Sequence, residues 1–287
     1  MKNLFLAILT LCVVSVALAQ DGDFHLDNVY KIDKRGTIDL SSSDAKVYIT
    51  GSLRPDVHVK IDRSVETKGI YNSREEFTVD VETVGGDLRI RERSNSQMNG
   101  LITYQREDYK IQIEAPEGVT LSIRGDDGDY FIKNINGSIS MSLDDADAQL
   151  SACKGNTFTF RIDDGDIRMD EGRGSLEVDA DDADIVVYKG QFTSIDANSD
   201  DGDIIIQTSL VDNGQYSFRC QDGLVSLDVT GGGGEFTVHH DDGHINTSGD
   251  FKTTYETEDL TRLTLARGNA KVTVRADDAR VKLGTGN

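Results

Sequence analysis

The chain has 287 residues, with 51 Asp and Glu against 30 Lys and Arg and a formal net charge of −21 at pH 7. This excess of negative charge argues against nucleic acid and against anionic membrane surfaces as partners, because both are bound by clustered positive charge. The chain contains no Trp, the most common platform for stacking on sugars, although 9 Tyr remain.

The first 19 residues have the pattern of a secretory signal peptide. Lys2 supplies a positive charge, and the apolar run over residues 4–19 ends in the small-x-small letters ALA. We therefore predict cleavage before Gln20, export to the periplasm, cell surface or medium, and no stable insertion into a membrane. A lipoprotein would use Cys12, but Leu11 before it is larger than the small residue usual at that place.

After this segment, one acidic four-residue phrase recurs along the chain as DDGD or DDAD. Its clear copies begin at positions 126, 144, 163, 181 and 200, so the steps are 18, 19, 18 and 19 residues. Weaker copies begin at 221, 241 and 277, and we interpret the last step of 36 as two steps with one degenerate copy between. A fixed period of this length is the signature of a repeat protein.

Each repeat contains two short runs in which apolar and polar residues alternate. Ile167 and Met169 follow one phrase, a glycine turn comes next, and Leu176, Val178 and Ala180 form the second run. A period of two predicts strands, and strands that cannot bury their apolar rows alone must stack. We therefore predict an all-β, right-handed parallel β-solenoid (β-helix) with about 18–20 residues per coil. The doubled period, 18 + 19 = 37, leaves a 37-residue coil as the alternative.

The repeats predict one solenoid domain over residues 20–287. Residues 20–108 are interpreted as irregular N-terminal repeats and residues 109–287 as the regular DDxD repeats. Two polar insertions, 63–76 and 93–105, are predicted to be loops. Irregular terminal repeats are common in solenoids because they cap an exposed edge.

The segment Ile113 to Ile123 reads IEAPEGVTLSI and leads directly into GDxxI phrases separated by G-S-I or G-x-F turns. In these features the chain resembles the putative adhesin family of exported bacterial β-strand-repeat proteins, a domain of unknown function. The resemblance covers nearly all of the chain after the signal peptide and implies a parallel β-solenoid. The family supplies no functional residue, and the doubled aspartates here are more acidic than its usual single-Asp phrase.

The repeat architecture predicts a non-enzymatic, adhesin-like protein of the cell envelope or surface. Phe131, Val186 and Ile205 occupy the outward positions of the strand after the phrase and are predicted to face solvent. Apolar residues stacked on one solvent face form a candidate surface for a partner, here an unknown surface protein or polysaccharide. A passive scaffold or spacer is the alternative, and the sequence leaves the oligomeric state open.

No catalytic or cofactor site is predicted. A polysaccharide-cleaving site would use Asp241, Asp242 and His244. The two catalytic carboxyl groups of a glycosidase need different environments, whereas these aspartates recur in every repeat. A transition-metal site would use His239, His240, Asp241 and His244, yet strand alternation directs the first two to opposite faces.

Stacked phrases would bring aspartates to about 4.8 Å from one another, where like charges repel by roughly 1 kcal/mol in water. Asx turns, in which an Asp oxygen accepts the backbone amide two residues on, are the expected relief. Ordered Ca²⁺ between coils is the alternative. The candidate Ca²⁺ ligands are the first two aspartates of each clear phrase: Asp126, Asp127, Asp144, Asp145, Asp163, Asp164, Asp181, Asp182, Asp200 and Asp201.

Two cysteines remain after the signal peptide. Cys153 and Cys220 lie more than three repeats apart, which is too far for a disulfide in a stacked coil. Cys220 continues an inward apolar row and is predicted to be a buried thiol, whereas Cys153 is placed in a turn.

Overall fold

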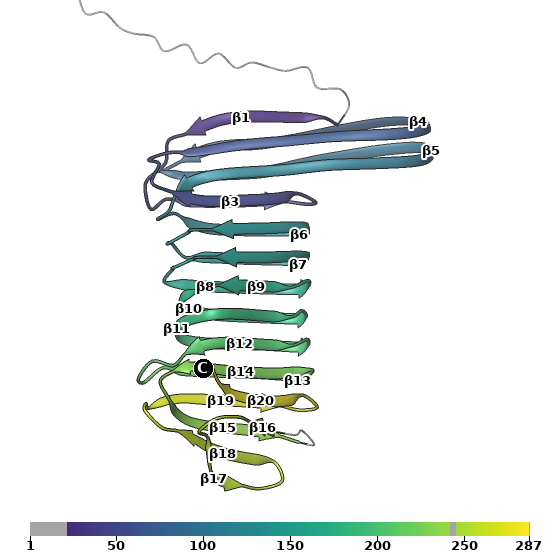
Figure 1. Ribbon diagram of the computed structural model, residues 1–287. Helices are drawn as coiled ribbons and strands as arrows, with labels where there is room; N and C mark the ends of the chain where they lie inside the picture. Colours follow the sequence, from purple (N-terminus) through teal and green to yellow (C-terminus); the bar gives the residue numbers. More distant parts are fainter. Residues whose placement is uncertain (1–21, 242–244, 287) are drawn as a thin grey trace, which may run out of the picture.

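The computed structural model describes residues 22–241 and 245–286, with side chains described outside 67–75 and 96–105 (Figure 1). The predicted signal peptide therefore lies outside the described residues. Twenty strands join in one hydrogen-bonded network, and the described residues contain no helix. The predicted all-β class is confirmed, and the strands stack into a solenoid-like rod.

The middle of the rod is a stack of parallel coils in sequence order. Leu121 pairs with Ile139, Ile139 with Phe158, Phe158 with Leu176 and Leu176 with Ile195, so equivalent residues lie 18 or 19 positions apart. The strands are β6 (Thr120–Lys133), β7 (Ile139–Ser151), β8 (Thr157–Asp164), β9 (Ile167–Asp170), β10 (Arg173–Asp182), β11 (Ile185–Asp201), β12 (Ile204–Ser209), β13 (Gln215–Asp222) and β14 (Leu224–Gly231).

Each coil is flattened, with the acidic phrase at one edge and the glycine turn at the other. We call the phrase edge the aspartate corner, the strand runs before it the pre-corner face, and those after it the post-corner face. In β7 the pre-corner run buries Ile139, Met141 and Leu143, and the post-corner run buries Ala148 and Leu150. The strict alternation of the sequence thus becomes one narrow core between two faces.

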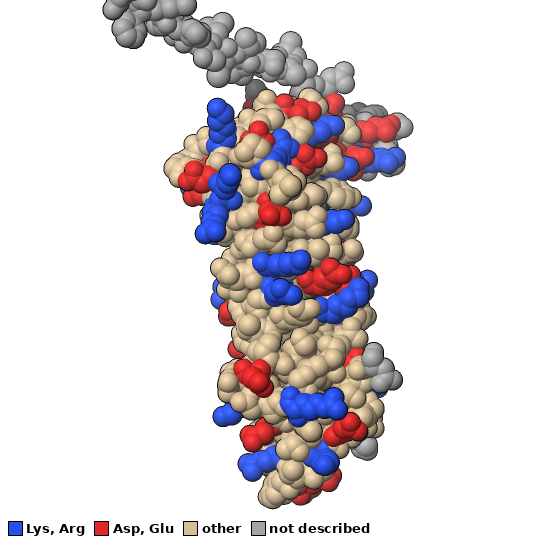
Figure 2. Space-filling model, turned by 60° about the vertical axis from the view of Figure 1, so that its left-hand side comes forward, with Lys and Arg blue, Asp and Glu red and all other residues tan. Residues whose placement is uncertain are grey.

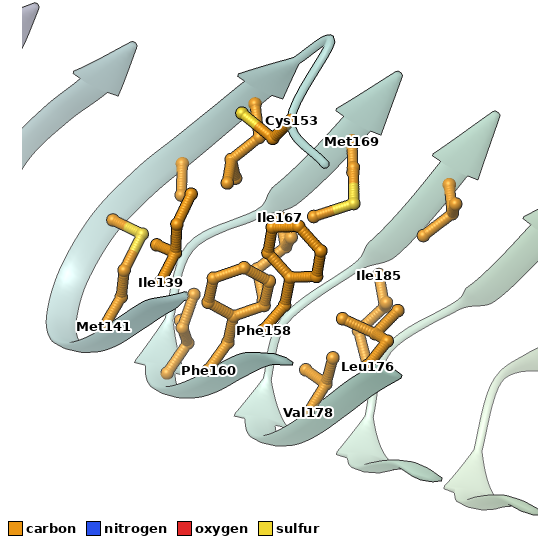
Figure 3. Close-up of a cluster of buried hydrophobic side chains, with 14 of the residues drawn as sticks. Ile139, Met141, Cys153, Phe158, Phe160, Ile167, Met169, Leu176, Val178 and Ile185 are labelled. Carbon is orange, nitrogen blue, oxygen red and sulfur yellow. The ribbon is translucent and has the colours of Figure 1, made fainter. Parts of the chain in front are cut away.

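Neighbouring coils continue the same buried rows. Ile139, Phe158 and Leu176 stack on one side of the core and point toward Ile167 and Ile185 on the other (Figure 3). Burying one large aliphatic or aromatic side chain stabilises the fold by about 1.5–3 kcal/mol. The unbroken stack of such rows is therefore what holds the rod together.

The alternation of Gly and Ala in the phrase has a backbone cause. Gly165 has a φ of 111°, and a Cβ placed on it would lie 2.5 Å from the carbonyl oxygen of Ala146 in the coil before. Likewise, a Cβ placed on Gly202 would lie 2.3 Å from the carbonyl oxygen of Ala183. The methyl groups of Ala146 and Ala183 are buried, each with 2% of the residue exposed. From Gly128 to Gly202, successive corners therefore alternate between a glycine with a positive φ and an alanine that helps to fill the core.

The N-terminal end is closed by a long antiparallel hairpin. Its strands are β4 (Val57–Val84) and β5 (Asp87–Pro116), and β1 (Phe24–Tyr30) pairs with β4 at the outer edge. The first coil, β2 (Thr37–Ser42) and β3 (Lys46–Ser52), lies between β5 and β6.

The predicted loops at 63–76 and 93–105 are therefore wrong, because both segments are paired strands of this hairpin. Figure 1 shows β4 and β5 extending beyond the coils on one side. A two-stranded arm that projects past the core needs no apolar row, so its sequence lacks the pattern of a buried strand.

The C-terminal end departs from sequence order. Strands β15 (Gly234–His240) and β16 (Ile245–Thr247) form a coil, and β17 (Lys252–Glu256) and β18 (Leu260–Leu265) close the end by antiparallel pairing. The last coil, β19 (Ala270–Ala276) and β20 (Arg280–Thr285), then inserts between the coil of β13 and β14 and that of β15 and β16. The predicted degenerate copy between the phrases at 241 and 277 is wrong, because this stretch forms β16 and the closing hairpin.

Candidate binding face

The structure places the ten candidate Ca²⁺ ligands along the aspartate corner. Asp145 is the direct neighbour of Asp127 on one side and of Asp164 on the other. A hydrogen bond with the Asp145 carboxyl raises the pKa of Asp164 above its ordinary value of 3.8, and desolvation and the charges of neighbouring carboxylates raise it further. In the described part of the chain, no three His, Cys, Asp or Glu side chains gather into a group that could hold a metal. All ten are exposed: Asp126, Asp127, Asp144, Asp145, Asp163, Asp164, Asp181, Asp182, Asp200 and Asp201.

The fourth aspartate of the phrase links neighbouring coils. The backbone N–H of Asp166 donates to Oδ1 of Asp147 at 2.9 Å, and that of Asp203 donates to Oδ1 of Asp184 at 2.7 Å. These bonds run between coils, whereas the expected Asx turns would join residues two apart along the chain. Charged acceptors of this kind make stronger hydrogen bonds than neutral ones, so they offset part of the repulsion along the corner.

The predicted partner residues lie in one outer row of the post-corner face, but they are not equally accessible. Phe131 and Ile205 are half-buried, whereas Val186 is only 7% exposed. The prediction that Val186 faces solvent is therefore wrong. Arg168 and Ile205 occupy the two flanking positions of the row, one strand away on either side.

Phe131 lies at one wall of a shallow groove on this face. Tyr48 of β3 pairs with Phe131 across the strands, and their rings are stacked with centroids 4.9 Å apart and planes 13° apart. The Nζ atom of Lys110 lies 4.8 Å from the Tyr48 ring centroid, on a cation–π contact. We call this hollow, of about 320 Å³, the aromatic groove; it is lined by Tyr48, Thr50, Phe131, Ile132, Lys133, Gln149, Leu150, Ser151, Arg168 and Asp170.

Tyr48 was not among the residues singled out from the sequence. It belongs to the first coil, where the repeat is blurred, and the intervening hairpin separates it from Phe131 by more than 80 positions. A usable signal exists in the alignment of DAKVYIT with DGDYFIK, which puts Tyr48 opposite Phe131 once β3 and β6 are recognised as adjacent coils.

The charges around the aromatic groove are unusual for so acidic a chain. Asp170 is within 3.5 Å of Lys189 Nζ and so has a cationic partner. Lys133 and Arg168 form no ion pair with any described carboxylate, and neither does Lys110. The groove therefore presents positive charge that is not paired with any described carboxylate.

A second, more polar hollow of about 640 Å³ lies on the pre-corner face. Its lining includes Arg219, Lys271 and Arg275 together with Glu177 and Asp196, so both signs of charge are present. Lys, Arg, Asp and Glu are interspersed in the view of Figure 2 as well, with wide uncharged areas between them. The three cationic side chains of this hollow outnumber its two carboxylates by one.

Of the residues weighed for enzymatic or transition-metal chemistry, His239, His240 and Asp241 are described. Asp242 and His244 lie outside the described residues. His239 is exposed, whereas His240 is half-buried with Nε2 3.2 Å from Thr261 Oγ1. Asp241 is exposed at the end of the strand. The pattern matches the alternation expected from the sequence, which directs the two histidines to different sides of β15.

Both cysteines are buried free thiols. Cys153 lies within the glycine-turn edge but points into the core (Figure 3), so its place in a turn does not leave it exposed. Burial raises the pKa of the Cys153 thiol and raises that of Cys220 to about 11. Both are therefore poor nucleophiles in the folded chain.

Three solved structures match the chain over most of its length at low sequence identity. A putative adhesin from Bacteroides fragilis NCTC 9343 is 12% identical, covers 91% of this chain and 97% of its own, and has a TM-score of 0.47. A putative cell adhesion protein from Clostridium sporogenes ATCC 15579 is 11% identical, with coverages of 92% and 100% and a TM-score of 0.31. A putative lipid binding protein from Parabacteroides distasonis ATCC 8503 is 13% identical, with coverages of 90% and 96% and a TM-score of 0.35.

Among the described residues, no helix is long and apolar enough to cross a membrane. No curated protein matches the chain. The Toastrack DUF4097 family model matches residues 35–283, which include the N-terminal hairpin and all the coils except the last two residues of β20. The resemblance to an uncharacterised, adhesin-like family is thus confirmed, and the chain belongs to the Toastrack DUF4097 family.

Proposed function

We propose that this chain is an exported, non-enzymatic, adhesin-like protein of the cell envelope or surface, and that it binds its partner along the post-corner face. Its scaffold in this proposal is a right-handed β-solenoid with about 18–20 residues per coil, released by removal of residues 1–19. The partner is a surface protein or a polysaccharide. The observation that carries the proposal is the aromatic groove, which combines a stacked ring pair with uncompensated positive charge.

Two physical features support binding at this place. Aromatic rings supply large contact areas with little loss of conformational freedom when a partner docks. The Gln149 amide and the Ser151 hydroxyl line the same hollow and can fix the orientation of a polar ligand. Both lie on strands whose backbone is held by neighbouring coils, so the site is preformed.

A passive spacer is the second candidate. Antiparallel strands close both ends of the stack, with β1 outermost at one end and β17 at the other. Capped ends prevent further stacking and suit a rod of fixed length. Ca²⁺ held at the aspartate corner would stiffen such a rod, which is the remaining candidate role for the exposed aspartates.

The test is binding of a purified chain of residues 20–287 to whole bacterial cells and to immobilised cell-surface polysaccharides. Phe131→Ala removes one wall of the groove and is expected to reduce binding at least tenfold. Tyr255→Ala is the matched control, because Tyr255 is a 49% exposed aromatic residue in the C-terminal cap. Absence of binding by the unsubstituted chain, or equal binding by the Phe131→Ala chain, would refute the proposed binding role and favour the spacer.

A further inference from the structure

We propose that the aromatic groove recognises a single carboxylated sugar ring within an acidic polysaccharide. The ring lies against the free face of Phe131, and its carboxylate pairs with the Arg168 guanidinium. The inference rests on the proposed function and names the chemistry of its partner. No covalent step is involved.

The geometry of the row sets the width of the site. Phe131, Gln149 and Arg168 are consecutive neighbours across three parallel strands, so the outer two are about 9.6 Å apart at about 4.8 Å per strand. The Phe131 and Tyr48 rings are 4.9 Å apart and nearly parallel, close to one strand spacing. The Phe131 ring therefore stands upright on the sheet, with its other face directed toward the position above Gln149.

One ring fits this slot and two do not. Carbon atoms in contact lie about 3.5–4.0 Å apart, so a ring between two walls needs about 7–8 Å. The spacing between the walls formed by Phe131 and Arg168 exceeds this required width by about 2 Å. The extra space allows for the pucker of a pyranose ring. The shorter Gln149 and Ser151 side chains line the hollow and offer an amide and a hydroxyl to the sugar hydroxyls.

Charge favours an acidic sugar over a neutral one. Arg168 and Lys133 line the groove without an ion-pair partner among the described carboxylates, although the chain as a whole carries a net charge of −21. A guanidinium is suited to a carboxylate because its planar fork donates two parallel hydrogen bonds. Asp170, held near Lys189 Nζ at 3.5 Å, supplies an acceptor for hydroxyls beside the carboxylate site.

A sugar also fits better than an acidic peptide. Peptides commonly bind sheets by adding a strand to an open edge, where backbone groups are unpaired. The groove lies in the middle of the stack, because β6, β7 and β9 each have parallel neighbours on both sides. No backbone edge is available there, so recognition falls to rings and side chains.

The test is isothermal titration of residues 20–287 with oligogalacturonate, an oligomer of carboxylated pyranoses. The neutral galactose oligomer of equal length and an oligoglutamate peptide serve as comparison ligands. The unsubstituted chain is expected to bind oligogalacturonate at least tenfold more tightly than either, and added NaCl is expected to weaken this binding.

Four variants separate the two contacts. Arg168→Gln is expected to weaken the binding of oligogalacturonate at least tenfold, so that it binds no more tightly than the neutral oligomer. Arg168→Lys is expected to recover part of the lost affinity. Phe131→Leu keeps an apolar side chain without a flat ring and should weaken both sugars. Arg124→Gln is the control, because Arg124 is exposed on the pre-corner face and should leave binding unchanged. Circular dichroism and the melting temperature verify that each variant folds.

The outcomes distinguish this inference from the proposed function. No binding of oligogalacturonate at millimolar concentration, equal affinity for the neutral oligomer, tighter binding of oligoglutamate, or no effect of Arg168→Gln would each overturn the inference. If cell binding nevertheless depends on Phe131, the proposed function stands with a partner of different chemistry. If Phe131→Ala leaves cell binding unchanged, the proposed function itself fails.

Discussion

Gly165→Ala tests the explanation given for the corner. The φ of Gly165 is 111°, outside the favoured regions of an L-residue, and conformations of this kind cost about 1–3 kcal/mol. The added Cβ would also lie 2.5 Å from the Ala146 carbonyl oxygen, whereas comfortable contacts are about 3.5–4.0 Å. That oxygen belongs to the backbone of the neighbouring coil, so relief requires the coils to shift. We expect a loss of about 3 kcal/mol in the free energy of unfolding.

Gly85→Ala separates backbone strain from the clash. Gly85 has a φ of 63° in the hairpin turn, and a Cβ there would meet nothing within 4 Å. Its expected cost is about 1 kcal/mol, from the left-handed conformation alone. Urea unfolding followed by circular dichroism measures both variants, and an unchanged slope with denaturant validates the comparison. The difference of about 2 kcal/mol corresponds to about 4–8 °C in melting temperature. Equal losses in the two variants would show that contact with the preceding coil does not require glycine.

Three further predictions concern the corner and the core. The raised pKa of Asp164 means that the folded chain holds this proton more tightly than the unfolded chain, so the contribution favours folding below about pH 3.8 and disappears as the pH rises through the raised pKa. Asp145→Asn should therefore raise the melting temperature at pH 7 more than at pH 3, and an equal rise at both would contradict this. Tyr216→Phe should cost about 1–3 kcal/mol in urea unfolding, because the hydroxyl accepts one buried backbone N–H and donates to one carbonyl, each at 2.9 Å. The 45% exposed Tyr188 is the control, and Tyr188→Phe should be neutral. Cys153 should react with a thiol reagent only in denaturant, and rapid labelling of the folded chain would refute its burial.

The regular part of the fold was predictable because local pattern and long-range packing agree there. Residues such as Met141 and Leu150 alternate with polar neighbours at a period of two, and each coil repeats its neighbour after 18 or 19 positions. The degree of burial of an outward-facing side chain was not predictable, because it depends on the side chains in the coils above and below. Val186 is buried although its position in the strand is outward.

Only part of the candidate site could be predicted from the sequence. Phe131 was found because it follows a clear phrase, whereas Tyr48 and Lys110 come from the first coil and the hairpin, where the period is lost. The order of the last coils was equally hidden. Every coil presents a similar edge to the next, so the spacing between the phrases at 241 and 277 does not reveal which coils are neighbours.

The insertion of β19 and β20 bears on how the protein is made. The coil of β15 and β16 lies one layer beyond its place in the sequence, and the layer it leaves open is filled only by residues 270–285. A chain that folds from its N-terminal side can stack coils in order as far as β14, but it cannot complete this layer until residues 270–285 are available. The unfilled layer keeps parallel strand edges open until then, so the docking of β19 and β20 is the step that pairs them.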